Sequence, residues 1–127
     1  MHADYLVDTN ILIYHSNGNP KCTSFIESLI KSHSFFISVI TKIEFLGWHE
    51  HQKSLLPLWN QLIAAANILP LDNRVTDSAI NLRQKKKIHL GDAVIAATAI
   101  EHKLKLATRN IADFVNIQDL KVFDPAV

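Results

Sequence analysis

The stretch Tyr5-Leu6-Val7-Asp8-Thr9-Asn10 decides the fold. Its first three residues are apolar and suit a buried strand, and a second apolar run follows at residues 11–14. A helix is predicted to begin there, with Thr9 or Asn10 as its capping residue. Asp8 then lies at the carboxyl end of a central strand, where open α/β sheets bind their ligands. Taken alone, Asp8 is better interpreted as only a helix cap, so a chemical role requires other carboxylates at the same edge.

Length and composition indicate one globular domain. The chain has 127 residues and 48% hydrophobic content, so we expect residues 1–127 to form a single domain with one core. One cysteine, Cys22, cannot form an internal disulfide, which favours a reducing, cytoplasmic location. The start of the chain carries Asp4 and Asp8 and lacks the basic residues of a secretory signal. No apolar run approaches the length of a membrane span.

The charge is unevenly distributed, although the net charge is only +1. Residues 74–121 contain nine Lys and Arg against five acids, whereas the rest of the chain has an excess of acids. A basic half beside an acidic cluster fits a protein that binds a polyanion and acts on it through a metal. The run Lys85-Lys86-Lys87 is, by itself, also typical of a solvated helix end.

Strands and helices alternate along the remaining chain. Apolar and β-branched runs predict strands at residues 34–37, 68–71, 104–107 and near 121–123, with helical periodicity between them. Asn19 with Pro20, Ser38 and Asp72 are residues that commonly begin helices. This alternation predicts an α/β fold of three α/β/α layers around a mainly parallel, five-stranded sheet.

Three of the predicted helices bear on function. After Ser38, an apolar stripe of Val39, Ile40, Ile43 and Leu46 is expected to face the core, with Glu44 at its border. The helix over residues 55–63 has more apolar side chains than one core face needs, which makes it the candidate dimer surface. The helix after Gly91 is apolar nearly all round and should be buried. Asp92 in its first turn therefore needs a capping role, a partner or a metal.

Four acids are predicted at or just past the strand ends: Asp8, Glu44, Asp92 and Asp113. Two carboxylates about 4 Å apart repel by about 4 kcal/mol at an effective dielectric of 20, so four together require cations. Oxygen ligands select Mg²⁺ or Mn²⁺, and such ions suit phosphoryl transfer by an activated water. Phosphates could be held by a set of basic residues: Arg109, Lys85, Lys86 and Lys87. No Gly-rich nucleotide loop is present, so ATP or NAD chemistry is unsupported.

Four segments, in order, resemble the motifs of PIN-domain ribonucleases. They are Leu6-Val7-Asp8-Thr9-Asn10, Ser38-Val39-Ile40-Thr41-Lys42-Ile43-Glu44, Gly91-Asp92-Ala93-Val94-Ile95-Ala96-Ala97 and Thr108-Arg109-Asn110-Ile111-Ala112-Asp113-Phe114. Their spacing is similar to that of the VapC toxins of bacterial toxin–antitoxin pairs. The resemblance implies a homodimeric endoribonuclease that requires Mg²⁺, for which Mn²⁺ may substitute, and that a small VapB-like antitoxin inhibits. By position, the four acids would be the catalytic metal ligands, and Asn10 and Thr108 would be polar helpers.

Two other functions are compatible with parts of the sequence. A receiver-like phosphoacceptor domain also places acids and Mg²⁺ at a parallel sheet edge, but here Asp8 is followed by Thr9, and Asp72 is the sole candidate phosphoacceptor. A catalytically silent PIN-like module would bind RNA or protein without cutting. The presence of all four acids argues against this second alternative.

Overall fold

The computed structural model describes residues 4–127 and contains a five-stranded, wholly parallel sheet. The strands are β1 (Tyr5–Val7), β2 (Phe35–Ser38), β3 (Asn67–Leu69), β4 (Lys105–Ala107) and β5 (Val122–Phe123). Their order across the sheet is β3-β2-β1-β4-β5, so β1 is central. The prediction of a parallel, five-stranded sheet is confirmed, although β3 is shorter than expected and ends before Pro70.

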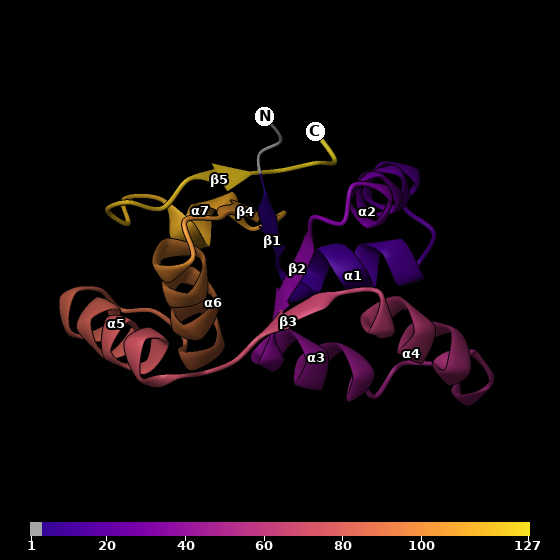
Figure 1. Ribbon diagram of the computed structural model, residues 1–127, viewed down its shortest axis with the longest axis horizontal. Helices are drawn as coiled ribbons and strands as arrows, with labels where there is room; N and C mark the ends of the chain where they lie inside the picture. Colours follow the sequence, from indigo (N-terminus) through magenta and orange to yellow (C-terminus); the bar gives the residue numbers. More distant parts are fainter. Residues whose placement is uncertain (1–3) are drawn as a thin grey trace.

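Helices cover both faces of the sheet, as the three-layer prediction required (Figure 1). One side carries α1 (Thr9–Ser16), α2 (Pro20–Lys31), α3 (Val39–Leu46), the short 3₁₀ turn η1 (Lys53–Leu55) and α4 (Leu56–Ala64). The other side carries α5 (Asn73–Lys85), α6 (Leu90–Glu101) and α7 (Ile111–Phe114). None of the helices within residues 4–127 is long and apolar enough to cross a membrane.

The central strand divides the core in two. Leu6 packs into the cluster of α5, α6 and α7, while Val7 packs into the cluster of α1 to α4. Both are fully buried, which explains why β1 reads as a continuous apolar run rather than an alternating one. Every residue of α6 from 93 to 99 is also buried, as its sequence predicted. Burial in the core therefore fixes the positions of β1 and α6, the elements next to Asp8 and Asp92.

Side-chain caps begin most of the long helices at the predicted residues. Asn19 accepts from the backbone N–H of Cys22, Ser38 from that of Ile40, and Asp72 from that of Val75. The prediction was wrong for α1, because Asp8 is its cap rather than Thr9 or Asn10. Asp8 is the last extended residue, and Thr9 and Asn10 are already helical, so neither can occupy the capping position.

The predicted inner faces of α3 and α4 need correction. Helix α3 buries Thr41 and Phe45, whereas Ile43 is 64% exposed. Glu44 thus borders a partly polar buried face, not an apolar stripe. In α4, Trp59 is only 7% exposed and belongs to the core, whereas Leu58 is 51% exposed. The candidate dimer helix therefore turns its tryptophan inward, which removes Trp59 from any docking surface.

Candidate active site

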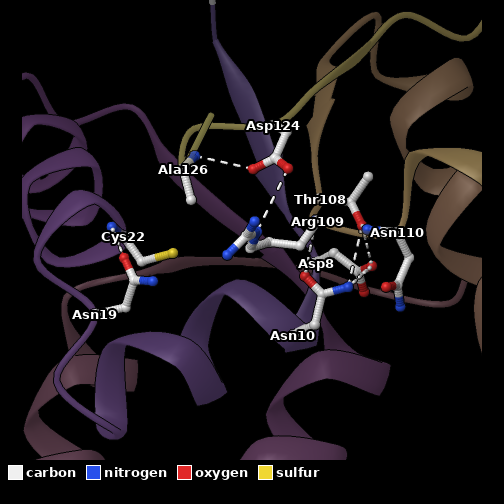
Figure 2. Close-up of polar contacts among 9 residues, drawn as sticks. All are labelled: Asp8, Asn10, Asn19, Cys22, Thr108, Arg109, Asn110, Asp124 and Ala126. Carbon is white, nitrogen blue, oxygen red and sulfur yellow. Dashed lines mark hydrogen bonds and ion pairs between the residues drawn. The ribbon is translucent and has the colours of Figure 1, made fainter.

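Asp8 lies at the carboxyl end of the central strand and is only 5% exposed. Three donors surround its carboxylate. The backbone N–H of Thr9 donates to Oδ1 at 2.7 Å, and the Thr108 hydroxyl donates to Oδ2 at 2.8 Å. The Asn10 amide also donates to Oδ2, at 3.2 Å. Figure 2 shows Thr108 and Asn10 directed at Asp8 from two sides. The carboxylate is therefore buried and oriented, and its oxygens are the acceptors in all three hydrogen bonds.

Asn10 and Thr108 form a small network that fixes this orientation. Asn10 Nδ2 donates to Thr108 Oγ1 at 3.1 Å, and the N–H of Asn110 donates to the same hydroxyl at 3.0 Å. The N–H of Arg109 donates to Asn10 Oδ1 at 3.2 Å, which sets the direction of the amide. Because β1 and β4 are neighbours, Thr108 lies beside Asp8 although many residues separate them. The structure thus brings both predicted helpers into contact with Asp8.

Glu44 reaches the same edge from α3. Its Oε1 accepts from the Thr9 hydroxyl at 2.6 Å, and that hydroxyl lies 3.1 Å from Thr41 Oγ1. On its other side stands Gly91, where an added Cβ would lie 3.2 Å from Glu44 Oε2. The Glu44 carboxylate is therefore held between α1 and the first turn of α6, and the glycine leaves the room for it.

Asp92 and Asp113 complete the edge from the other side of β1. Asp92 stands half-buried in the first turn of α6, and no hydrogen bond to its side chain is found among residues 4–127. The capping residue of α6 is His89, so capping does not explain Asp92. Asp113 is exposed on α7 and lines the same pocket as Asp92.

The acids influence one another electrostatically. Burial, together with the charges of Asp92 and Glu44, raises the pKa of Asp8 from 3.8 to about 6, against the opposing hydrogen bonds from Thr108 and Thr9. Burial and the charges of Asp113 and Glu44 also raise the pKa of Asp92, while His89 opposes that rise. The four predicted acids therefore act on one another along a single edge rather than occupying separate surfaces.

This donor set fits a hard divalent cation. All the candidate ligands are carboxylate, hydroxyl or amide oxygens, and the burial of Asp8 beside other acids creates a demand for positive charge. As the side chains lie, no three His, Cys, Asp or Glu residues within the described chain 4–127 are close enough to share one ion. Carboxylates without a cation between them repel one another, and Glu44 and Asp113 are both exposed to solvent.

The predicted phosphate-binding residues lie in three different places. Lys86 and Lys87 line a pocket of about 450 Å³ together with Asp92 and Asp113. Lys85 is exposed and lines a neighbouring pocket instead. Arg109 instead pairs with Asp124, as the dashed line in Figure 2 marks. Its Nε lies 3.4 Å from Asp124 Oδ2, and its guanidinium lies 4.9 Å from the ring centre of Tyr14.

Sequence reasoning missed two residues of this pocket, Arg83 and His89. Arg83 lies one helical turn before Lys86 near the end of α5, and His89 stands three residues before Asp92. Their proximity in sequence to Lys85-Lys86-Lys87 and to the Gly91-Asp92 motif could have identified them as candidate pocket residues.

A comparison with known proteins agrees with this arrangement. The family model of the PIN domain matches residues 5–119. The chain belongs to the PIN domain family. It is 31% identical to Ribonuclease VapC10 of Mycobacterium tuberculosis, over 91% of this chain and 90% of that protein. It is also 32% identical to Toxin FitB of Neisseria gonorrhoeae, over 94% of this chain and 96% of that protein.

Solved structures place this PIN domain among similar folds. A chain of a toxin–antitoxin complex from Klebsiella pneumoniae superposes with a TM-score of 0.80 at 30% identity, covering 96% of this chain and 98% of that one.

Membership of the PIN domain family overturns the receiver-like alternative. In this PIN domain Asp72, the sole candidate phosphoacceptor, accepts from the N–H of Val75 and caps α5.

Proposed function

We propose that this PIN domain is a divalent-metal-dependent endoribonuclease that acts as the toxin of a toxin–antitoxin pair. The observation that carries the proposal is the buried Asp8 carboxylate, oriented by Thr108 and Asn10 at an edge shared with three further acids. The names of the relatives, a ribonuclease and a toxin, support the same function. We further propose that residues 1–127 are one nuclease domain and that it works in the cytoplasm.

Asp8, Glu44, Asp92 and Asp113 are the proposed catalytic carboxylates and metal ligands. PIN-domain ribonucleases generally depend on divalent metals, and the oxygen donors here favour Mg²⁺, with Mn²⁺ as a substitute. A bound ion would lower the pKa of the attacking water and offset charge on the phosphate.

The chain's own residues supply the positioning. Thr108 and Asn10 keep the Asp8 carboxylate in one orientation, and Thr9 holds Glu44. Such preorganisation avoids reorganisation during the reaction. Lys85, Lys86, Lys87 and Arg109 are the proposed RNA contacts, with Lys86 and Lys87 best placed because they share a pocket with Asp92.

A VapB-like antitoxin and a second copy of the chain are the proposed protein partners. The structural relative from Klebsiella pneumoniae was solved as a toxin–antitoxin complex, which supports a protein inhibitor. Exposed apolar side chains at Leu55 and Leu58 provide a surface that a second copy can cover.

Cleavage of single-stranded RNA tests the proposed function. We expect cutting with Mg²⁺ or Mn²⁺ but not with EDTA, and products that carry a 5′-phosphate and a 3′-hydroxyl. Asp92→Asn should abolish cleavage without lowering the melting temperature measured in EDTA, because the Asp92 side chain makes no hydrogen bond within residues 4–127 and its charge is disfavoured by burial and by Asp113 and Glu44. Asp77→Asn, on the exposed face of α5, is the matched control and should cut normally.

Several outcomes would contradict the proposal. Equal cleavage in EDTA, or products with cyclic phosphates, would exclude attack by a metal-activated water. Binding of RNA without cleavage under any metal would favour the catalytically silent module instead.

A further inference from the structure

A basic pocket adjoins Asp92 and Asp113, and its cationic wall is not explained by metal binding. It has a volume of about 450 Å³ and lies between the end of α5, the start of α6 and α7. Figure 1 shows these three helices together on one side of the sheet. The cations that line this basic pocket are Arg83, Lys86 and Lys87, and His89, Leu90 and Asp92 line it as well. The basic pocket therefore shares one wall, which carries Asp92 and Asp113, with the candidate active site.

Cations and acids share the basic pocket without pairing. Within residues 4–127, the Lys and Arg side chains that form ion pairs are Arg74, with Glu101, and Arg109, with Asp124. Arg83 and Lys87 thus remain free to meet a ligand, although Asp92 and Asp113 line the same cavity. Positive charge kept apart from neighbouring acids suits a ligand that presents phosphate to one wall and its reacting group to the other.

Lys86 is held at the cationic wall of the basic pocket by a hydrogen bond. Its Nζ donates to the backbone carbonyl of Val115 at 2.9 Å, which ties the end of α5 to the segment after α7. This hydrogen bond favours a position of the Lys86 ammonium at the pocket wall, where it contributes positive charge. Arg83 and Lys87, which are exposed, can move to a ligand.

The pocket also offers apolar surface beside the cations. Leu90 is 62% exposed at the first position of α6, and Ala112 faces the same cavity from α7. A large aliphatic side chain left exposed between charged neighbours is suited to a ligand with a flat or weakly polar part. A nucleotide has this combination, because its phosphate is anionic and its ribose and base present such surface.

We propose that the basic pocket binds the nucleotide next to the cleaved bond in single-stranded RNA. Arg83 and Lys87 bind its phosphate, Lys86 adds to the positive wall, and Leu90 packs against its ribose or base. This subsite rests on the proposed nuclease function and gives that function a substrate feature: one flanking phosphate is required on the side of α5. Arg109, engaged with Asp124, and Lys85, outside the pocket, are not part of this subsite.

RNA binding provides the first test. The dissociation constant of a short single-stranded RNA is measured for Arg83→Gln, Lys87→Gln and a control, Lys121→Gln. Lys121 is exposed just before the amino end of β5, whereas Asp8 follows the carboxyl end of β1. We expect about tenfold weaker binding for each pocket variant and a slope of log K against log salt reduced by about 0.7. Equal effects in the control would overturn the subsite.

A scan with neutral phosphates locates the contact. Single methylphosphonates are placed in turn at each position around the cleaved bond. In the unmodified protein, a methylphosphonate at one flanking position should slow cleavage about tenfold. At that position the same substitution should cause no further loss in Lys87→Gln, because removing both partners of one contact costs no more than removing either one. Additive losses at every position would overturn the proposal.

The two proposals fail in different ways. Absence of cleavage with every metal refutes the nuclease function. In that case the dissociation constants of the methylphosphonate RNAs are measured instead of cleavage rates, and they still decide the subsite. Normal cleavage with unchanged binding by Arg83→Gln and Lys87→Gln refutes the subsite and leaves the nuclease function standing.

Discussion

Asp8 combines a local and a global role in one side chain. It caps α1 through the Thr9 N–H, and it is also the buried centre of the acidic edge. The capping interpretation and the functional one, which the sequence set against each other, are therefore compatible. The free-energy cost of the second role shows in the raised pKa, because burial penalises the charged form more than the hydrogen bonds favour it.

This cost predicts a specific pH dependence of stability. The pKa of Asp8 is about 6 in the folded protein and 3.8 in its unperturbed state, so between these values the folded protein binds more protons. The free energy of unfolding should consequently fall as pH rises from 3.8 to about 6, by about 3 kcal/mol from this group. In EDTA, denaturant titrations should show that Asp8→Asn lacks this fall.

Asp77→Asn serves as the control for that measurement, since Asp77 is exposed on α5 and should leave the pH profile unchanged. A profile for Asp8→Asn that matches the original protein would show that Asp8 is not the titrating group.

The contact between α3 and α6 decides how Glu44 meets the other acids. Gly91 stands where a Cβ would lie 3.2 Å from Glu44 Oε2 and 3.9 Å from Ile40 Cγ2. The backbone at Gly91 is ordinary helix, so its conformation does not require glycine. Its absence of a side chain instead allows the Glu44 carboxylate to approach the first turn of α6.

Gly91→Ala should therefore separate activity from stability. We expect cleavage to fall about tenfold, because Glu44 must move by a few tenths of an ångström or rotate away. The free energy of unfolding should stay constant or rise by up to about 1 kcal/mol, since alanine favours helix over glycine. Asn81→Ala, exposed on α5, tests helix propensity alone and should leave cleavage intact. Parallel losses of stability and activity in Gly91→Ala would contradict this account.

At the scale of the whole molecule, core and surface compete for the same apolar residues. The sequence marked residues 55–63 as a possible dimer surface because they are rich in apolar side chains. In the folded protein, Trp59 packs edge-on against Phe45 with ring centres 5.9 Å apart, while Leu55 and Leu58 face outward. The docking surface, if it lies here, is therefore made by the leucines.

Leu58→Glu should convert a homodimer to a monomer without unfolding it, because the new charge would be buried in the interface but solvated in the free chain. Sedimentation measures the mass, and circular dichroism checks the fold. Trp59→Glu, by contrast, should unfold the protein by burying a charge in the core. A dimeric Leu58→Glu variant would place the interface elsewhere.

Features that depend on near neighbours were predictable from the sequence. The apolar run before Asp8 defines β1, and the caps at Asn19, Ser38 and Asp72 define helix starts. Parallel topology follows from the alternation of strands and helices, and it brings the carboxyl ends of β1 and β4 to one edge. For the same reason the convergence of Asp8 and Thr108 was foreseeable.

Only the tertiary structure decided which side chains are buried, which are exposed and which of them contact one another. In short helices such as α3, several rotations bury similar apolar area, so packing against the sheet, not periodicity, selected Thr41 and Phe45 over Ile43. The pairing of Arg109 with Asp124 and the fit of Glu44 against Gly91 likewise join distant segments. The sequence by itself determined which residues stand at the strand ends, because that depends on local order. Which of them touch was determined by folding, because contact depends on how whole elements pack.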